Sequence, residues 1–256
     1  MEEQQRLACI VVGATGAIGA VIARGLATDG HNVVLVYHTA AGKANDLAED
    51  LRGMDGVILA HKADVTDREE VDRLVQTTLD RFGRVDMLVN TQGWMHDMHL
   101  LQDETFENIQ STIALELQSV ILCCKAVAPH MIMKGYGRII TIGSDSGKVG
   151  ASGGAVSSAC RAGVIGLSKA LARELARYKI TVNVVCPGPT ESPLLEALKT
   201  TSGLTKKLTE GMINAIPMRR LGTPDEIAAL ALFLAGPKAS FITGQAISVS
   251  GGLTMQ

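Results

Sequence analysis

The segment of residues 7–36 constrains the fold more than any other part of the chain. Two short apolar runs, LACIVV at its start and NVVLV at its end, enclose the glycine-rich stretch GATGAIG and a helical pattern. Unbroken apolar runs of this length are typical of parallel strands that are covered on both faces. The segment therefore predicts a strand, a helix and a second parallel strand at the start of an α/β domain.

The glycines of this segment also indicate a ligand. Gly13, Gly16 and Gly19 follow the first strand and lead into the helix. Glycines at such a turn let backbone N–H groups approach a pyrophosphate, and the helix dipole favours the anion. Thr15 and Ile18 belong to the same turn. The motif alone is a weak signal, but between a strand and a helix it predicts a dinucleotide-binding fold.

Composition narrows the class of protein. A chain of 256 residues can form one well-buried domain, and we expect residues 1–256 to do so. A net charge of −2 gives no reason to expect nucleic acid or an anionic membrane as a partner. The start, MEEQQR, is polar, and we expect neither a signal peptide nor a membrane-length apolar run. The five cysteines lack metal-ligand spacing, which predicts reduced core residues in a cytoplasmic protein.

The stretch from Ile139 to Lys169 carries the residues that bear on chemistry. A buried strand is followed by Ser144, then by Ser157 thirteen residues later and Arg161 four residues after that, in a helix rich in small side chains. With its flanking glycines and alanines, this stretch resembles the catalytic segment of the short-chain dehydrogenase/reductase family. That family has a Ser, a Tyr and a Lys at these three positions. The resemblance extends over nearly the whole chain and implies a single doubly wound Rossmann domain, with a seven-stranded parallel sheet and helices on both faces.

Three of the four catalytic positions of the family are changed. The resemblance places Ser157 where the family has the proton-transferring Tyr, Arg161 where it has Lys, and Glu116 where it has Asn; only Ser144 is kept. A serine hydroxyl is a much weaker acid than a phenol, and arginine stays protonated. Arg161 would be able to hold a ribose or phosphate but not to relay a proton. We therefore expect no intact catalytic set and no turnover by the family mechanism.

The cofactor positions are partly kept. The resemblance places NAD against a set of residues that follow the strand ends: Gly13, Thr15, Gly16, Ile18, Gly19, Tyr37, Asp64, Val65, Asn90, Gly93, Pro187, Gly188 and Thr190. Tyr37 stands where an acid would grip the adenosine ribose, and no arginine replaces it to favour NADP. Gln92 replaces an alanine of the family and would intrude on the cofactor. These departures predict a vestigial or weak cofactor site. The sequence leaves open that another group of the chain holds the ribose.

Other segments allow more than one interpretation. His96, Asp97 and His99 could supply a metal ligand or a base, but we favour a substrate-side loop and expect no metal. Residues 105–134 and 155–178 are long helices that pack on a second subunit in the family, or simply cover the sheet here. The cations between Ser192 and Leu221 could meet the phosphates of a coenzyme A ester, although solvated charge is the default.

Three functions remain open on the sequence. The stretches SGGAVSSACRAG and VNVVCPGPTES and the ending GLTM resemble dehydrogenases that act on 3-hydroxyacyl-coenzyme A esters of aromatic or other ring compounds. The first hypothesis is a non-catalytic subunit of such an NAD-dependent enzyme, in a heterotetramer whose active homologous subunit binds NAD and the CoA ester. The second is an NAD(P)(H)-binding sensor without turnover. The third is an active dehydrogenase that uses Glu116, His96 or His99 as its acid or base.

Overall fold

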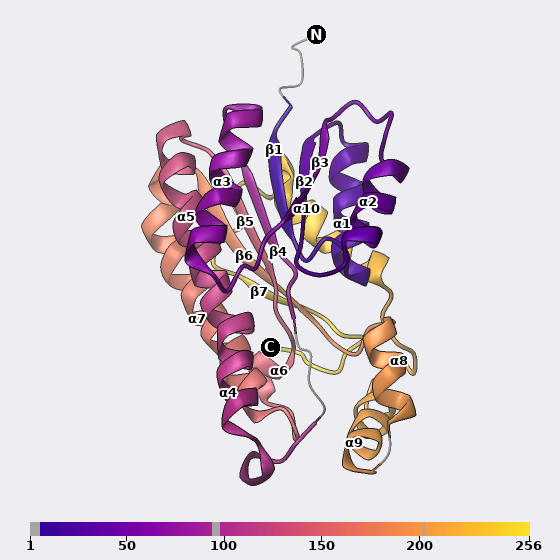
Figure 1. The fold of residues 1–256 in the computed structure, drawn as a ribbon. Helices are drawn as coiled ribbons and strands as arrows, with labels where there is room; N and C mark the ends of the chain where they lie inside the picture. Colours follow the sequence, from indigo (N-terminus) through magenta and orange to yellow (C-terminus); the bar gives the residue numbers. More distant parts are fainter. Residues whose placement is uncertain (1–5, 94–97, 202) are drawn as a thin grey trace.

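Seven parallel strands form one sheet at the centre of the computed structural model, which describes residues 6–93, 98–201 and 203–256 (Figure 1). The sheet order is β3-β2-β1-β4-β5-β6-β7. The strands are β1 (Ala8–Val12), β2 (Asn32–Tyr37), β3 (Ile58–Lys62), β4 (Met87–Asn90), β5 (Gly137–Ile142), β6 (Ile180–Pro187) and β7 (Ala246–Val249). The seven-stranded parallel sheet predicted from the sequence is confirmed.

Helices cover both faces of the sheet because successive strand residues point to opposite sides. Ile10 and Val12 pack toward α3 (Arg68–Phe82), α5 (Ser119–Lys134) and α7 (Ala155–Leu175), whereas Cys9 and Val11 pack toward the opposite layer. The opposite layer consists of α1 (Ala17–Thr28), α2 (Ala41–Asp50) and α10 (Pro224–Ala235). Figure 1 shows these two layers on either side of the strands. The result is a doubly wound fold with an apolar core on each face.

The predicted helix over residues 105–134 is continuous but not regular. It begins as α4 (Phe106–Ile113), widens into a π-helical turn at Ala114–Gln118 and continues as α5. Residues Phe106–Lys134 form a helix of 29 residues that is long and apolar enough to cross a membrane. The expectation of no such run was therefore wrong, although the buried side of α5 packs on the strands as a core helix does.

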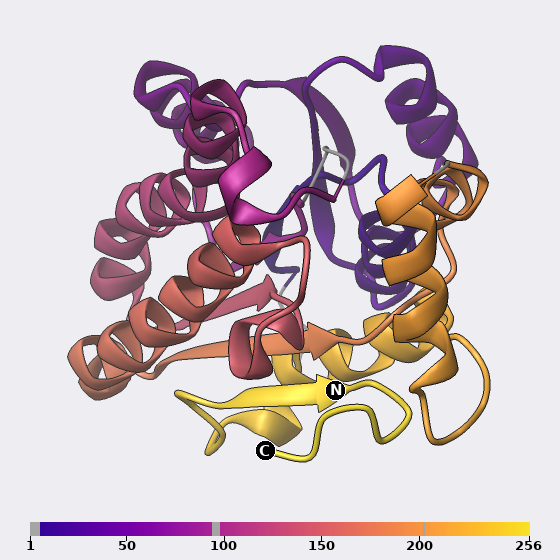
Figure 2. The same ribbon diagram turned by 90° about the horizontal axis from the view of Figure 1, so that it is seen from below.

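The carboxyl ends of the strands share one edge of the sheet, and the segments that follow them meet there. This edge carries α6 (Ser146–Val149), α8 (Pro193–Thr200), α9 (Gly203–Asn214) and the C-terminal end of the chain. Figure 2 looks onto this edge and shows α8 and α9 on the opposite side from α4 and α7. In open α/β sheets, ligands bind outside the carboxyl ends of the strands, where connections diverge to opposite faces. The sequence-predicted site residues lie along this edge.

The start of α10 combines a side-chain cap with an ion pair that can be tested. Thr223 caps the helix and forms a capping box with Glu226, whose carboxylate also accepts two hydrogen bonds from Arg220, at 2.6 and 2.8 Å. The Arg220 hydrogen bonds, followed by that from the Thr223 backbone, lower the pKa of Glu226 to about 2. A carboxyl group whose pKa is lowered on folding stabilises the folded state above its unfolded pKa and loses that contribution as the pH falls.

We expect the stability difference between the wild-type chain and Glu226→Gln to shrink as the pH falls from about 5 to about 2. In this window the unfolded Glu226 takes up a proton and the folded one does not. Urea unfolding of both proteins at a series of pH values measures the difference. Glu210→Gln, which changes an exposed acid of α9, is the control, and a difference independent of pH would contradict the assignment.

Candidate functional site: a buried ion pair at the catalytic positions

The three changed catalytic positions contact one another. The Ser157 hydroxyl donates a hydrogen bond of 2.6 Å to Oε2 of Glu116, and Nε of Arg161 lies 3.0 Å from the same oxygen. Glu116 is 1% exposed and Arg161 is 6% exposed, so this is an ion pair shielded from water. We call Glu116, Ser157 and Arg161 the Glu116 cluster. The substitutions that the sequence presents separately are thus parts of one network.

Local structure explains why the cluster forms. Ser157 and Arg161 are four residues apart on α7, which places both side chains on one face of that helix. Glu116 belongs to the π-helical turn between α4 and α5, and this turn packs against α7. The close approach depends on a small residue, because a Cβ at Gly163 would lie 3.2 Å from Leu117. The turn and the glycine together bring Glu116 within reach of Arg161.

The remaining guanidinium nitrogens of Arg161 are directed into the protein. Nη1 donates a hydrogen bond of 3.0 Å to the carbonyl oxygen of Ile142, and Nη2 lies 3.0 Å from the position that a Cβ would take on Gly93. The sequence allowed Arg161 to hold a ribose or a phosphate, and that possibility stays a prediction. In the structure the guanidinium contacts Glu116 and the end of β5.

This arrangement leaves little capacity for proton transfer. The Ser157 proton is directed at Glu116, and the carboxylate of Glu116 is held by Arg161, so neither group is presented to a ligand. Oε1 of Glu116 is buried and has no hydrogen-bond partner among the described residues. Ser144 is half-buried, and its hydroxyl accepts hydrogen bonds from the backbone and side chain of Ser146. Within the cluster, the carboxylate and the guanidinium thus form a buried ion pair.

The pyrophosphate turn, in contrast, has the shape that a dinucleotide requires. Gly13 has a φ of +73°, and a Cβ on Gly19 would lie 2.4 Å from the Gly13 carbonyl oxygen. Gly16 caps α1 without any side chain, so the first N–H groups of the helix are not taken by a capping residue. Thr15 and Ile18 lie in the same turn and are half-buried. Backbone N–H groups at a glycine-rich helix start can hold the diphosphate of NAD(P).

Replacing Gly19 with alanine is expected to lower the free energy of unfolding by about 1–3 kcal/mol, because the added methyl group forces the Gly13 backbone to move. Gly166→Ala is the matched control: it is an exposed helical glycine of α7 with open space around its Cβ position. We expect the control to raise stability by roughly 0.5–1 kcal/mol. Chemical denaturation measures both, and equal effects would contradict the tight packing at Gly19.

The adenosine side matches the sequence interpretation. Tyr37 ends β2 half-buried, beside Lys62 in the sheet register, and no acid lies at that position. The Asp64 side chain accepts hydrogen bonds from the backbone and hydroxyl of Thr66, and Nε2 of His38 lies 3.8 Å from it. Val65, next to Asp64, is buried. Weak dinucleotide binding stays a prediction.

On the nicotinamide side, Gln92 makes a contact with a neighbouring helix. The sequence did not predict that its Nε2 donates a hydrogen bond of 2.9 Å to the Ser119 hydroxyl on α5; its intrusion on the cofactor space stays a prediction. Asn90 is buried and donates to Thr141 on β5, and its Oδ1 has no partner in the described part of the chain. Across the edge, the Thr190 hydroxyl donates to the Gly188 carbonyl oxygen, and Pro187 ends β6.

Two other segments hold candidate residues: the loop with His96, Asp97 and His99, and residues 192–221, which we call the lid. His96 and Asp97 lie outside the described residues, and His99 is half-buried with its backbone N–H bonded to the Gly153 carbonyl oxygen. No metal-ligating group of three or more His, Cys, Asp or Glu side chains occurs within residues 6–93, 98–201 and 203–256. Most cations of the lid form an ion pair or a hydrogen bond with another group of the chain. The pairs are Lys199 with Glu196, Lys206 with Glu210, Arg219 with the Asn214 carbonyl oxygen, and Arg220 with Glu226.

The cysteines behave as core residues. All five lie in the described part of the chain, are buried and form no disulfide. Burial raises the pKa of Cys186, at the end of β6, to about 11 and that of Cys124 to about 12. Both thiols therefore stay protonated at neutral pH and are poor nucleophiles.

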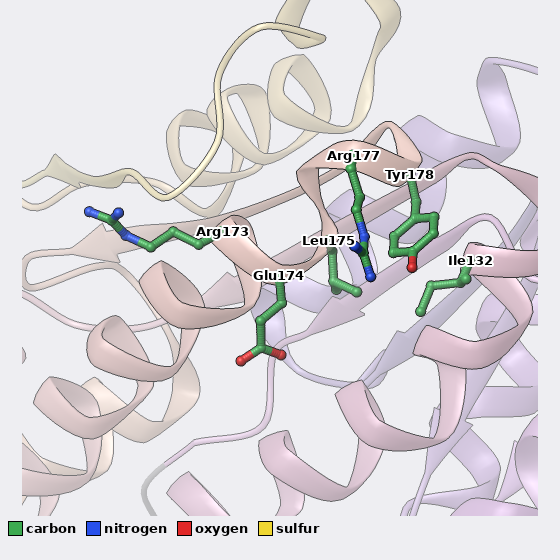
Figure 3. Close-up of a pocket in the computed structure, with 6 residues that line it drawn as sticks. All are labelled: Ile132, Arg173, Glu174, Leu175, Arg177 and Tyr178. Atoms are coloured by element: carbon green, nitrogen blue, oxygen red, sulfur yellow. The ribbon is translucent and has the colours of Figure 1, made fainter.

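A groove lies at the far end of α7, away from the Glu116 cluster. Figure 3 shows Ile132 of α5 facing Arg177 and Tyr178. The Cζ atom of Arg177 lies 4.7 Å from the centre of the Tyr178 ring. Ser157 and Tyr178 are separated by nearly the whole length of α7, which is about 30 Å at the helical rise per residue. The groove therefore has no part in the candidate site.

Comparison with known proteins settles the family. A family model described as enoyl-(acyl carrier protein) reductase matches residues 13–254. This chain belongs to the short-chain dehydrogenase/reductase family. It is 40% identical over 247 residues to the 3-oxoacyl-[acyl-carrier-protein] reductase of Synechocystis sp., with 96% of each chain covered. The Staphylococcus aureus (strain Mu50) reductase of the same name is 38% identical, over 96% of this chain and 97% of its own. The D-beta-hydroxybutyrate dehydrogenase of Rhizobium meliloti is 35% identical, over 96% and 98%.

Membership in the family gives the changed positions their meaning. The seven-stranded parallel sheet of a short-chain dehydrogenase/reductase is present, and the Glu116 cluster consists of the three residues that the sequence comparison predicts at catalytic positions. Sequence reasoning found all three positions but missed their pairing. One signal of this pairing was available in the sequence: the acid Glu116 stands where the family has an uncharged Asn, in the same expected site as the cation Arg161. The π-helical turn at Glu116 and the hydrogen bond between Gln92 and Ser119 had no signal in the sequence.

Proposed function

We propose that this chain is a non-catalytic member of its family that works beside an active, homologous subunit. The Glu116 cluster is the observation that carries the proposal. In a carbonyl reduction, a group within about 3 Å of the carbonyl oxygen must give up a proton as the nicotinamide delivers hydride. Here the Ser157 hydroxyl, predicted at the tyrosine position, donates a hydrogen bond to Glu116 instead. The Arg161 guanidinium, predicted at the lysine position, pairs with Glu116 and donates to the Ile142 carbonyl oxygen.

The active subunit would bind NAD and interconvert a 3-hydroxyacyl and a 3-oxoacyl thioester. The names of two relatives, a 3-oxoacyl-[acyl-carrier-protein] reductase and a D-beta-hydroxybutyrate dehydrogenase, both concern an oxygen at the third carbon of an acyl group. We favour a coenzyme A ester of an aromatic or other ring compound. The sequence motifs resemble the inactive subunit of 2-[hydroxy(phenyl)methyl]succinyl-coenzyme A dehydrogenase, an enzyme of anaerobic toluene breakdown, which pairs such a subunit with an active one.

Co-expression with a homologous subunit that carries the full Ser, Tyr and Lys set tests the proposal. We expect native mass spectrometry to find a heterotetramer, and we expect dehydrogenase activity to be lost when the Tyr of that subunit is replaced by Phe. Ser144→Ala in this chain should leave the activity of the complex unchanged. A stable homotetramer that excludes every active homologue offered to it would contradict the proposal.

A cofactor sensor is the second candidate, and the intact pyrophosphate turn at Gly13 and Gly19 favours it. When bound, NAD(P) would be held at its diphosphate by the N–H groups of this turn, and the nicotinamide would supply hydride chemistry. Calorimetric titration of the isolated chain with NADH and NADPH distinguishes the candidates. Binding at micromolar concentration without turnover would favour the sensor, and no binding at millimolar concentration would exclude it.

A further inference from the structure

The geometry points to a latch at Lys148 that fastens the C-terminal segment of the chain to the loop that follows Ser144. We call residues 250–256 the strap. Lys148 lies on α6, and its Nζ donates a hydrogen bond of 2.9 Å to the Ser248 hydroxyl and one of 2.6 Å to the main-chain oxygen of Gln256. Lys148 thus reaches from the Ser144 loop to both the last strand and the end of the chain.

The other side of the strap is attached to the base of the lid. The backbone N–H of Met218 donates a hydrogen bond of 3.1 Å to the Gly251 carbonyl oxygen. Packing there is close, because a Cβ on Gly251 would lie 2.9 Å from Ile216 and one on Gly252 would lie 3.2 Å from Pro217. Thr254 is buried, with its N–H bonded to the Ser250 hydroxyl. The strap therefore joins the lid, β7 and α6.

Asp145 is the alternative partner that we infer for the Lys148 ammonium group. Its side chain is 4% exposed, and neither carboxylate oxygen has a hydrogen-bond partner among the described residues. A buried carboxylate without a partner is destabilising, and a nearby ammonium group relieves it. Lys148 is three residues further along, and its N–H already bonds to the Asp145 carbonyl oxygen at 2.9 Å. The Lys148 ammonium group is hydrogen-bonded to Ser248 and to Gln256 of the strap instead.

Lys148 therefore exchanges between two partners. With the strap docked, it holds Gln256 and Ser248; with the strap released, it pairs with Asp145, and Met218 loses its contact with Gly251. Because Asp145 directly follows Ser144 and Lys148 lies four residues beyond it, the position of the strap is transmitted to the Ser144 loop. A partner that captures the chain end would change the loop and the lid together. The inference does not depend on the proposed function.

Hydrogen–deuterium exchange of the full chain tests the latch. Lys148→Met keeps the apolar stem but removes the ammonium group, and we expect the N–H groups of Leu253 and Thr254 to exchange at least about tenfold faster. Asp145→Asn removes the competing charge, and we expect the same N–H groups to exchange more slowly. The N–H groups of α7 should be unchanged in both variants, which excludes a general loss of stability.

Two further variants complete the test. Lys238→Met removes an exposed cation elsewhere on the surface and should leave strap exchange unchanged, whereas Lys148→Arg keeps a cation that can hold Gln256 and should resemble the wild type. Unchanged strap exchange in Lys148→Met would overturn the latch. Unchanged or faster exchange in Asp145→Asn would overturn the alternation between two partners. If Lys148→Met does not fold, faster exchange in Lys148→Gln tests the same contact.

Discussion

Replacing Glu116 with alanine is expected to lower the free energy of unfolding by about 3–5 kcal/mol. The substitution leaves the guanidinium of Arg161 buried with no carboxylate beside it, and it removes the acceptor for the Ser157 hydroxyl. Oε1 of Glu116 has no hydrogen-bond partner among the described residues, so the wild-type pair carries a desolvation penalty. The loss of stability therefore measures the charge left on Arg161 more than the pair itself.

Urea denaturation of three variants separates these contributions. Glu107→Ala, an exposed acid on the first turn of α4, is the control and should change stability by less than about 1 kcal/mol. The double variant Glu116→Leu with Arg161→Met removes both charges and should recover most of the loss. A small effect of Glu116→Ala, similar to the control, would mean that Arg161 is not stabilised by Glu116.

Restoring the residues of the family at the cluster is expected to create turnover. The triple variant Glu116→Asn, Ser157→Tyr and Arg161→Lys removes the buried pair and supplies a phenol beside an ammonium group. A well-placed acid–base group contributes roughly 10²–10⁴-fold to the rate. We therefore expect the triple variant to reduce acetoacetyl-coenzyme A with NADH or NADPH faster than the enzyme-free rate by about that factor. The triple variant leaves the glycine turn at Gly13, Gly16 and Gly19 unchanged, and this turn is the diphosphate site that the sequence predicts.

The single variant Ser157→Tyr separates geometry from chemistry. It adds the phenol while Glu116 and Arg161 stay paired, so we expect at most slight activity and a loss of stability from overpacking. Adding Ser144→Ala to the triple variant should abolish the gain, because Ser144 is the one catalytic residue that the chain keeps. A folded triple variant without activity would show that the defect lies in cofactor or substrate binding and not in the Glu116 cluster.

Much of the fold followed from the sequence because local signals agreed with one another. The strand at Ala8–Val12 and the glycine turn at Gly13 each depend on residues close together in the chain. The positions of Glu116, Ser157 and Arg161 were also predicted, because each follows a recognisable stretch. What they do was harder to foresee, since it depends on how two helices cross.

The contacts that were not foreseen share a physical cause. The sequence did not predict that Arg161 pairs with Glu116 or that Gln92 hydrogen-bonds to Ser119, two contacts between neighbouring elements. Long polar side chains are set by tertiary contacts that no local pattern encodes, and a buried polar group takes whatever partner is in reach. The contacts of Lys148 with Ser248 and Gln256 join residues about a hundred positions apart and were beyond the same limit.

Steady-state turnover of the purified chain alone tests the central claim most directly. Acetoacetyl-coenzyme A with NADH or NADPH, and 3-hydroxybutyryl-coenzyme A with NAD or NADP, cover both directions of the reaction. The buried pairing of Glu116 with Arg161 and Ser157 predicts no turnover above the enzyme-free rate in either direction. Turnover by the wild-type chain that disappears in Glu116→Gln or Ser144→Ala would contradict it and make the cluster a working catalytic site.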